Sequence, residues 1–241
     1  MPWRYSGSKK RLLKFLPSPP LGTKTIIEPF AGSAAYGLHY KPSQLVLAEA
    51  NTDVRELWNW VATTATAKDL TELEAKKPTE KVDIRTLGLS KPQETLMRLS
   101  ISGAYVGQLS SFIAYPQHSF DLSVLREVLP YLQRSVQRPV LDDYTKTART
   151  NGFYFVDPPY LKTQGNYIDK SAKEDMTGGV TADAIKGFLA SLKGPWLFTY
   201  GEGAPEVFPE FQWHLAVIRK VPILRGGGTR DRREWYCKGG W

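Results

Sequence analysis

The stretch FYFVDPPY, residues 153–160, constrains the fold of this chain more than any other. Its apolar residues predict a buried strand that ends at Asp157. Asp157 and Pro158 each precede a proline, which favours extended backbone, and both prolines have a fixed φ and no N–H. The strand therefore ends in a rigid, extended segment. This segment presents a carboxylate, a carbonyl that no neighbouring turn uses as a hydrogen-bond acceptor, and the ring of Tyr160.

These three groups suit a flat base that carries an exocyclic amine. Such an amine is a poor nucleophile because its lone pair is conjugated into the ring. Asp157 and the Pro158 carbonyl can each accept one N–H, which pulls the nitrogen towards tetrahedral geometry and directs its lone pair at an incoming methyl group. Tyr160 can stack on the base, so catalysis would consist of positioning and electrostatics. The alternative is a strand that ends in a Pro-rich turn, with Tyr160 as a packing residue.

The rest of the chain predicts an α/β fold around this strand. In the first third, a strand, a helix, a second strand and a second helix follow one another, which is typical of a parallel sheet covered by helices. Ser33 is an N-cap type before the first helix, and Asn51 or Thr52 begins the second. The expected strands also cover residues 25–30, 45–50, 195–203, 213–224 and 233–239, the last two as a closing hairpin, and helices include 51–65 and 181–194.

The middle of the chain has a different character. Amphipathic helical segments cover residues 69–77, 91–107 and 121–136, separated by Pro and Gly breaks, and no strand is predicted among them before about 139. We therefore expect a helical insertion in the α/β domain.

The turn EPFAGSAA, residues 28–35, follows the first strand and predicts a cofactor site. Ligands of parallel α/β sheets lie at the carboxyl ends of the strands. Gly32 lets the backbone approach a cofactor closely, and the next helix offers N–H groups. Glu49 ends the second strand 17 positions later, near the spacing at which an acid binds the ribose of a nucleotide-like cofactor. The alternatives are an ordinary turn and a solvated acid at a strand end.

The charge distribution indicates a polyanionic partner. The formal net charge is +8, and basic residues gather at 1–14 and 219–233, whereas 54–147 is nearly balanced. These edges would meet a phosphate backbone, unless both are merely solvated surface. Cys237 is the single cysteine, which excludes an internal disulfide and a cysteine-only zinc site. No apolar run approaches the ~18 residues of a membrane span. We expect no metal, no membrane contact and a reducing compartment.

Several motifs, in the same order along the chain, resemble those of one family. The resemblance is to the Dam-like, D12-class adenine-N6 DNA methyltransferases of bacteria and phages, and it extends almost end to end. The residues 91–112 resemble the helix-and-loop stretch of the family's target-recognition domain. The other motifs are RYSGSK (4–9), EPFAGSAA (28–35), LAEAN (47–51), FYFVDPPY (153–160) and RGGGTRDRREWY (225–236).

The resemblance implies a Rossmann-like, S-adenosylmethionine-dependent methyltransferase sheet with an inserted helical target-recognition domain. The catalytic domain would comprise residues 1–55 and 146–241, and the insertion 56–145. The enzyme would transfer a methyl group from S-adenosylmethionine to the N6 amine of a flipped-out adenine in double-stranded DNA, at a short recognition sequence. It would act as a monomer or weak dimer in the cytoplasm of a bacterial or phage-infected cell, in restriction-modification, phage protection or regulation.

The resemblance also assigns roles to individual residues. Tyr5 would flank the adenine of the cofactor, and Glu49 would hold its ribose. The catalytic residues would be Asp157, Pro158 and Tyr160. The cofactor site would comprise Tyr5, Lys9, Phe30, Ala31, Gly32, Glu49 and Asp157. The DNA contacts would come from Lys9, Lys10, Tyr105, Gln108, Arg230, Arg232 and Arg233, with the basic ends on the same face as Tyr160.

The recognition sequence and the exact class of substrate stay open. Relatives that read GATC often carry an arginine shortly after the Y-x-G element, but here YVG (105–107) is followed by QLSSF, and the family's basic hairpin is shortened to IAYPQHSF. An RNA adenine-N6 methyltransferase would read shape and 2′-hydroxyls instead. A cytosine-N4 enzyme more often has Ser before the two prolines. A non-catalytic DNA-binding relative would lack Asp157 or carry a broken EPFAG turn.

Overall fold

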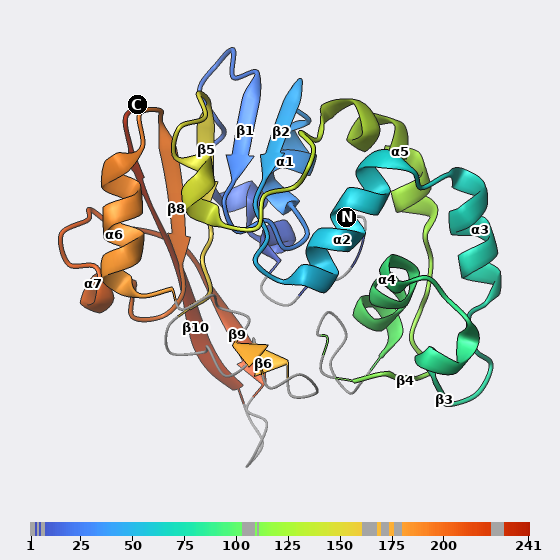
Figure 1. The fold of residues 1–241 in the computed structure, drawn as a ribbon. Coiled ribbons are helices and arrows are strands. Elements are labelled where there is room, and N and C mark those ends of the chain that lie inside the picture. The colour runs from blue at the N-terminus through green and yellow to red at the C-terminus, as the bar shows by residue number, and fades with distance from the viewer. Residues whose placement is uncertain are drawn as a thin grey trace.

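A six-stranded sheet forms the centre of the computed structural model, which describes residues 3, 5, 8–102, 109, 111–160, 168–169, 174–175, 180–222 and 229–241. Its strands are β1 Thr25–Glu28, β2 Gln44–Leu47, β5 Phe153–Val156, β8 Trp196–Tyr200, β9 His214–Pro222 and β10 Thr229–Gly239. The order is β2-β1-β5-β8-β10-β9; the first four strands are parallel, and β10 and β9 add an antiparallel hairpin (Figure 1). The predicted α/β class with a mainly parallel sheet is confirmed.

The strand order brings the predicted chemical motifs to one edge of the sheet. β1 lies between β2 and β5, with Glu28 opposite Leu47 and Ile27 opposite Tyr154. Because these strands are parallel, the turns that follow them meet at their carboxyl ends. The EPFAG turn, Glu49 and Asp157 therefore gather at this edge.

Three helices follow strands of the sheet as the sequence predicts. They are α1 Ala35–Tyr40, α2 Thr52–Thr63 and α6 Ala182–Ser191. The Asn51 side chain caps α2 by accepting a backbone N–H at 2.9 Å. Ser33 does not cap α1, so that prediction is wrong. Ala34 occupies the cap position in a left-handed conformation (φ 47°), and the Ser33 hydroxyl instead bonds to the Ser8 hydroxyl at 3.2 Å.

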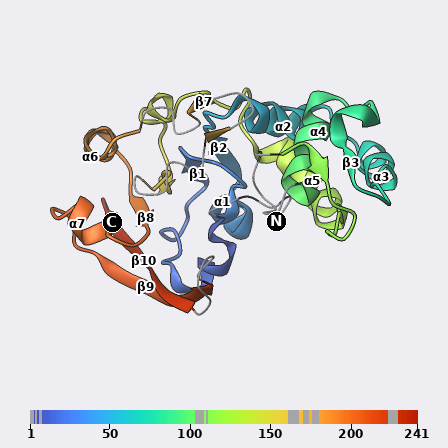
Figure 2. The ribbon, with the colours of Figure 1, turned by 90° about the horizontal axis from the view of Figure 1, so that it is seen from below.

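Between β2 and β5 the described chain forms mainly helices, which lie together beside the sheet (Figures 1 and 2). The helices α3 Ala67–Ala75, α4 Lys91–Ile101 and α5 Ser123–Ser135 fall within or close to the three amphipathic segments. The prediction that no strand interrupts them is wrong, because β3 Val82–Asp83 pairs with β4 Ile113–Ala114. Two-residue strands are too short to show an alternating pattern. One apolar core joins these helices to the sheet and includes Leu45, Trp58 and Leu99. The division into a catalytic domain and a recognition domain stays a prediction.

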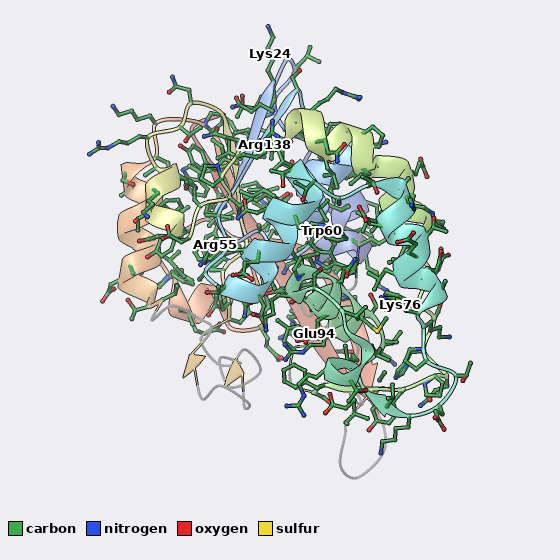
Figure 3. All side chains as sticks on the ribbon, turned by 45° about the vertical axis from the view of Figure 1, so that its right-hand side comes forward. Lys24, Arg55, Trp60, Lys76, Glu94 and Arg138 are labelled. Carbon is green, nitrogen blue, oxygen red and sulfur yellow. The ribbon has the colours of Figure 1, made fainter. Side chains whose placement is uncertain are left out.

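A buried arginine ties this helical block together. Arg98 of α4 is 1% exposed and pairs with Asp53 of α2 at 3.1 Å. Its guanidinium lies 3.7 Å from the ring centroid of Phe112, and it donates to the Leu109 carbonyl. Glu94, one turn earlier on α4, lies 4.0 Å from the same guanidinium (Figure 3). Arg98 thereby fixes the chain at Leu109 and Phe112 relative to α2 and α4.

The remaining described elements are short. They are α7 Ala204–Val207, the paired strands β6 Ile168–Asp169 and β7 Glu174–Asp175, and 3-10 turns at Lys9–Arg11, Leu13–Phe15, Ile84–Leu87 and Tyr144–Thr147. Among the helices of the described residues, none has both the length and the apolar character that crossing a membrane requires.

Candidate active site

A cavity of about 410 Å³ lies at the carboxyl ends of β1, β2 and β5. Its volume is in the range of small-molecule sites. Its walls include every residue predicted to bind the cofactor, together with Pro158 of the predicted catalytic group. These residues are Tyr5, Lys9, Phe30, Ala31, Gly32, Glu49, Asp157 and Pro158. The fold thus brings into one cavity residues that lie far apart in the sequence.

Gly32 is required by the close approach of an aromatic ring. Its φ is 48°, a left-handed conformation that side chains rarely adopt, and a Cβ there would lie 2.8 Å from the Tyr5 ring. The Gly32 carbonyl accepts a hydrogen bond from Trp58 Nε1 at 2.9 Å, and its N–H donates to Glu49 Oε2 at 2.9 Å. Trp58, Glu49 and the Tyr5 ring therefore fix the turn at Gly32.

Glu49 is a buried carboxylate of the cavity wall and not a solvated acid. It is 8% exposed, and its Oε1 accepts the N–H of Asn51 at 3.0 Å. Burial raises the pKa of Glu49, although the N–H groups of Asn51 and Gly32 and the Arg55 cation oppose the increase. Arg55, on α2 (Figure 3), donates to the Glu49 carbonyl at 2.9 Å. Each carboxylate oxygen has two lone pairs, so Glu49 can accept further hydrogen bonds from a ligand.

Asp157 is paired with a lysine from the N-terminal segment. Lys9 Nζ lies 2.6 Å from the Asp157 carboxylate, and the Thr199 hydroxyl donates to Oδ1 at 2.9 Å. The side chains of Lys9 and Asp157 are 4% and 18% exposed. Burial raises the pKa of Asp157, and the Lys9 ammonium and both hydrogen bonds oppose that increase. The geometry holds an orientated carboxylate at the tip of β5, with its partners on two other elements.

Tyr160 is held in packing contacts next to this pair. Its hydroxyl donates to Glu234 Oε2 at 2.9 Å, and its ring centroid lies 4.8 Å from that of Tyr200. Two cations approach the ring: Lys9 Nζ lies 5.0 Å and Arg232 Cζ 5.8 Å from its centroid. Tyr160 is 7% exposed and is not among the described walls of the cavity. A base that stacked on this ring would have to displace one of these neighbours.

The sequence analysis missed two parts of the cavity. Glu28, at the end of β1, is 2% exposed, and burial raises its pKa to about 8 although the Gly37 N–H donates to it at 2.6 Å.

The second part of the cavity that the sequence analysis missed is the turn that comprises Asp142, Asp143, Tyr144 and Thr145. Its Tyr144 ring stacks on Phe30 with centroids 4.9 Å apart. The D-x-T pattern, in which Asp143 accepts the Thr145 N–H, marks a turn but does not predict its contact with Phe30.

The residues predicted to contact DNA differ in their exposure to solvent. Lys10 and Arg233 are exposed, whereas Lys9 is 3% exposed. Arg232 is partly exposed and pairs with Glu234 at 3.2 Å. Because side chains alternate along a strand, Arg233 does not share the face of β10 that carries Arg232. Tyr105, Gln108 and the side chain of Arg230 lie outside the described residues.

The described residues offer no obvious metal site. In the ranges that the structure covers, no group of three or more His, Cys, Asp and Glu side chains is placed to hold a metal ion.

The parallel sheet, the glycine turn and the acid at the end of the second strand fit the class of α/β methyltransferases. Comparison with known proteins narrows this class. Residues 5–87 match the family described as D12 class N6 adenine-specific DNA methyltransferase. The modification methylase StsI of Streptococcus sanguinis is 26% identical over 201 residues, which are 70% of this chain and 30% of that protein. The resemblance to the D12 class that the motifs predicted is thus confirmed, and the match spans about a third of the length of this curated relative.

Proposed function

We propose that this chain transfers a methyl group from S-adenosylmethionine to the N6 amine of adenine in double-stranded DNA. The observation that carries the proposal is the position of Asp157: at the end of β5, in the same cavity as Glu49 and the Gly32 turn. A base amine and a nucleotide-like cofactor would meet in such a cavity. Because the curated relative is a modification methylase, we place this activity in DNA modification.

The residues of the cavity fit S-adenosylmethionine. Glu49 retains lone pairs for ribose hydroxyls, and the rings of Tyr5 and Phe30 offer flat apolar contacts. Glu28, Glu49 and Asp157 are three carboxyl groups whose pKa values burial raises. A positively charged ligand such as this sulfonium cofactor would favour their ionised forms. When bound, the cofactor would supply an electrophilic methyl group.

The target amine would be activated by hydrogen bonds to the chain. Asp157, held by Lys9 and Thr199, would accept one N–H of the amine, and the Pro158 carbonyl would accept the other. The nitrogen lone pair would then point towards the cofactor side of the cavity. The methyl group that the cofactor supplies would pass to this nitrogen, the thioether product would leave, and the Asp157 carboxylate would accept the proton that the amine loses. Preorganised acceptors of this kind act by stabilising charge as it develops.

The adenine would have to leave the DNA stack to reach Asp157, which costs a few kcal/mol. The helices between β2 and β5 are proposed to read bases, and the basic ends to hold phosphates. The recognition sequence is left open, because the arginine expected after YVG is absent.

The proposal is tested by incubating the chain with labelled S-adenosylmethionine and duplex DNA, and by digesting the product to nucleosides. N6-methyladenine in DNA is the expected product. Methylated RNA but not DNA, or N4-methylcytosine, would assign the chain to another substrate class. Binding of duplex DNA without cofactor binding or methyl transfer would indicate a non-catalytic relative.

Glu49→Ala is expected to weaken binding of S-adenosylmethionine by roughly tenfold or more, because buried hydrogen bonds to a carboxylate are worth about 1.5–3 kcal/mol. Affinity for duplex DNA should change little, since Glu49 lies at the end of β2 and is 8% exposed. Calorimetry with each ligand makes the comparison, and thermal unfolding checks that the variant is folded. Normal cofactor affinity would remove Glu49 from the site.

Replacing Lys10 and Arg233 together with alanine is expected to weaken binding to all DNA sequences about equally. Both residues are exposed, so the double variant should leave the core intact. The slope of log K against log salt should fall by roughly one unit for each phosphate that the variant no longer binds. Lys24→Ala is the control, because Lys24 precedes β1 at the far end of the strands from Asp157 (Figure 3). An unchanged slope in the double variant would mark these residues as solvated surface.

A further inference from the structure

Glu234 of β10 is a buried carboxylate with two hydrogen-bond donors and a third, ion-paired neighbour. It is 3% exposed. Its Oε2 accepts the Tyr160 hydroxyl at 2.9 Å, and its Oε1 lies 2.7 Å from Arg219 Nη2 and 3.2 Å from Arg232 Nε. A buried carboxylate is stable only when paired in this way. The network therefore connects the closing hairpin of the sheet to the tyrosine of DPPY, 74 positions away in the sequence.

The arginines of this network are orientated by Glu234. Arg219 lies on β9 opposite Arg232 on β10, and both direct nitrogens at the same carboxylate oxygen. The Nε of Arg219 is buried and lacks a hydrogen-bond partner in the described part of the chain. An unpaired buried N–H is unfavourable, so the position of this guanidinium follows from its contact with Glu234.

The ring of Tyr160 is enclosed on its other sides. Gly201 follows β8, and a Cβ there would lie 2.5 Å from the Tyr160 ring. The Tyr200 ring packs against it at 4.8 Å, and Tyr200 is paired with Trp235, the residue after Glu234. Two prolines stiffen the backbone before Tyr160. The backbone before Tyr160 and the faces of its ring are thus restricted. The hydrogen bond from the Tyr160 hydroxyl to Glu234 then fixes the rotamer of the side chain.

We propose that Glu234 is the positioning residue of Tyr160. By holding the hydroxyl, Glu234 fixes the orientation of the ring on which the target base would stack once it displaces one neighbour of that ring, and Arg219 and Arg232 hold the Glu234 carboxylate in place. The inference deepens the proposed function and rests on it, since it requires that Tyr160 contact the base. A purely structural Glu234 would instead stabilise the hairpin without affecting turnover.

A double-mutant cycle in kcat separates these two roles. Tyr160→Phe removes the hydroxyl, and Glu234→Gln leaves one acceptor oxygen for three donors. Each single variant is expected to lower kcat roughly tenfold at unchanged cofactor affinity, and the double variant should lie within about twofold of the worse single variant. Multiplication of the two effects to about a hundredfold, or wild-type turnover in Glu234→Gln, would overturn the inference. Glu210→Gln is the matched control, because Glu210 pairs with Lys186 on the surface at 3.1 Å.

A second measurement needs no methyl transfer. In protein labelled with ¹³C at the tyrosine ζ carbons, the Tyr160 signal is identified among the 12 tyrosines by its loss in Tyr160→Phe. It should shift in Glu234→Gln and stay in place in Glu210→Gln. An unmoved signal in Glu234→Gln would overturn the inference. A wild-type protein that transfers no methyl group would instead contradict the proposed function, while the Tyr160 signal would still show whether Glu234 holds the ring.

Discussion

Replacing Asp157 with alanine is expected to lower the single-turnover rate of methyl transfer by about 10³-fold or more. In the proposed reaction the carboxylate accepts an N–H of the target amine while charge develops on it, and loss of one preorganised partner of this kind costs about 10²–10³-fold. Asp157 also lines the cavity proposed to hold the cofactor, so its loss would disturb both reactants. The measurement uses saturating enzyme, cofactor and duplex DNA. An unchanged rate would remove Asp157 from the mechanism.

The same substitution is expected to reduce stability, because it leaves Lys9 without its carboxylate. Lys9 is 3% exposed, and removing the counter-ion of a buried cation costs a few kcal/mol. The double variant Asp157→Ala/Lys9→Met removes both charges and should unfold at a higher temperature than Asp157→Ala. Methyl transfer should stay abolished in the double variant. Recovery of both stability and activity would attribute the loss in Asp157→Ala to misfolding.

The sheet and most of the cavity were predictable because they depend on local pattern and on one topological rule. Apolar runs mark the strands, and parallel strands place their following turns at one edge. Gly32 follows a predicted strand, and Glu49 and Asp157 each lie at the end of one, so their meeting in one cavity requires no knowledge of side-chain packing. The family resemblance added Tyr5 and Lys9, which no periodicity indicates.

The contacts between distant segments were not predictable from pattern. Lys9 and Asp157 are 148 positions apart, and Tyr160 and Glu234 are 74 apart. Neither charge nor burial pattern in one segment specifies its partner in the other. The Asp142–Thr145 turn is likewise polar and reads as an ordinary loop. It reaches the cavity because the residues before it run beside β2, where Val136 bridges to Leu45 and Leu141 bridges to Ala48, the residue after β2.

The tight pairing of Lys9 with Asp157 leads us to expect that Lys9 tunes the carboxylate that we propose to be catalytic. Burial raises the pKa of Asp157, and the Lys9 ammonium is the largest influence against that increase. The proposed reaction needs the ionised carboxylate as acceptor. Lys9→Met removes the ammonium, so the pKa of Asp157 should rise further and the acceptor form should become scarcer at neutral pH.

Lys9→Met is therefore expected to lower methyl transfer at neutral pH by roughly tenfold or more, and the activity should recover as pH rises.

The stability of Lys9→Met should change with pH in the opposite direction. A carboxyl group whose pKa is higher in the folded than in the unfolded state stabilises the fold at low pH, and this contribution is lost as pH rises through the folded-state pKa. Lys9→Met should thus gain activity and lose stability over the same pH range, whereas Lys9→Arg, which keeps the charge, should resemble the wild type. The pH profile of kcat and thermal unfolding at each pH make the comparison, with calorimetry to confirm that cofactor is saturating. A loss of activity of equal size at every pH would mean that Lys9 contributes by contact alone and does not keep Asp157 ionised.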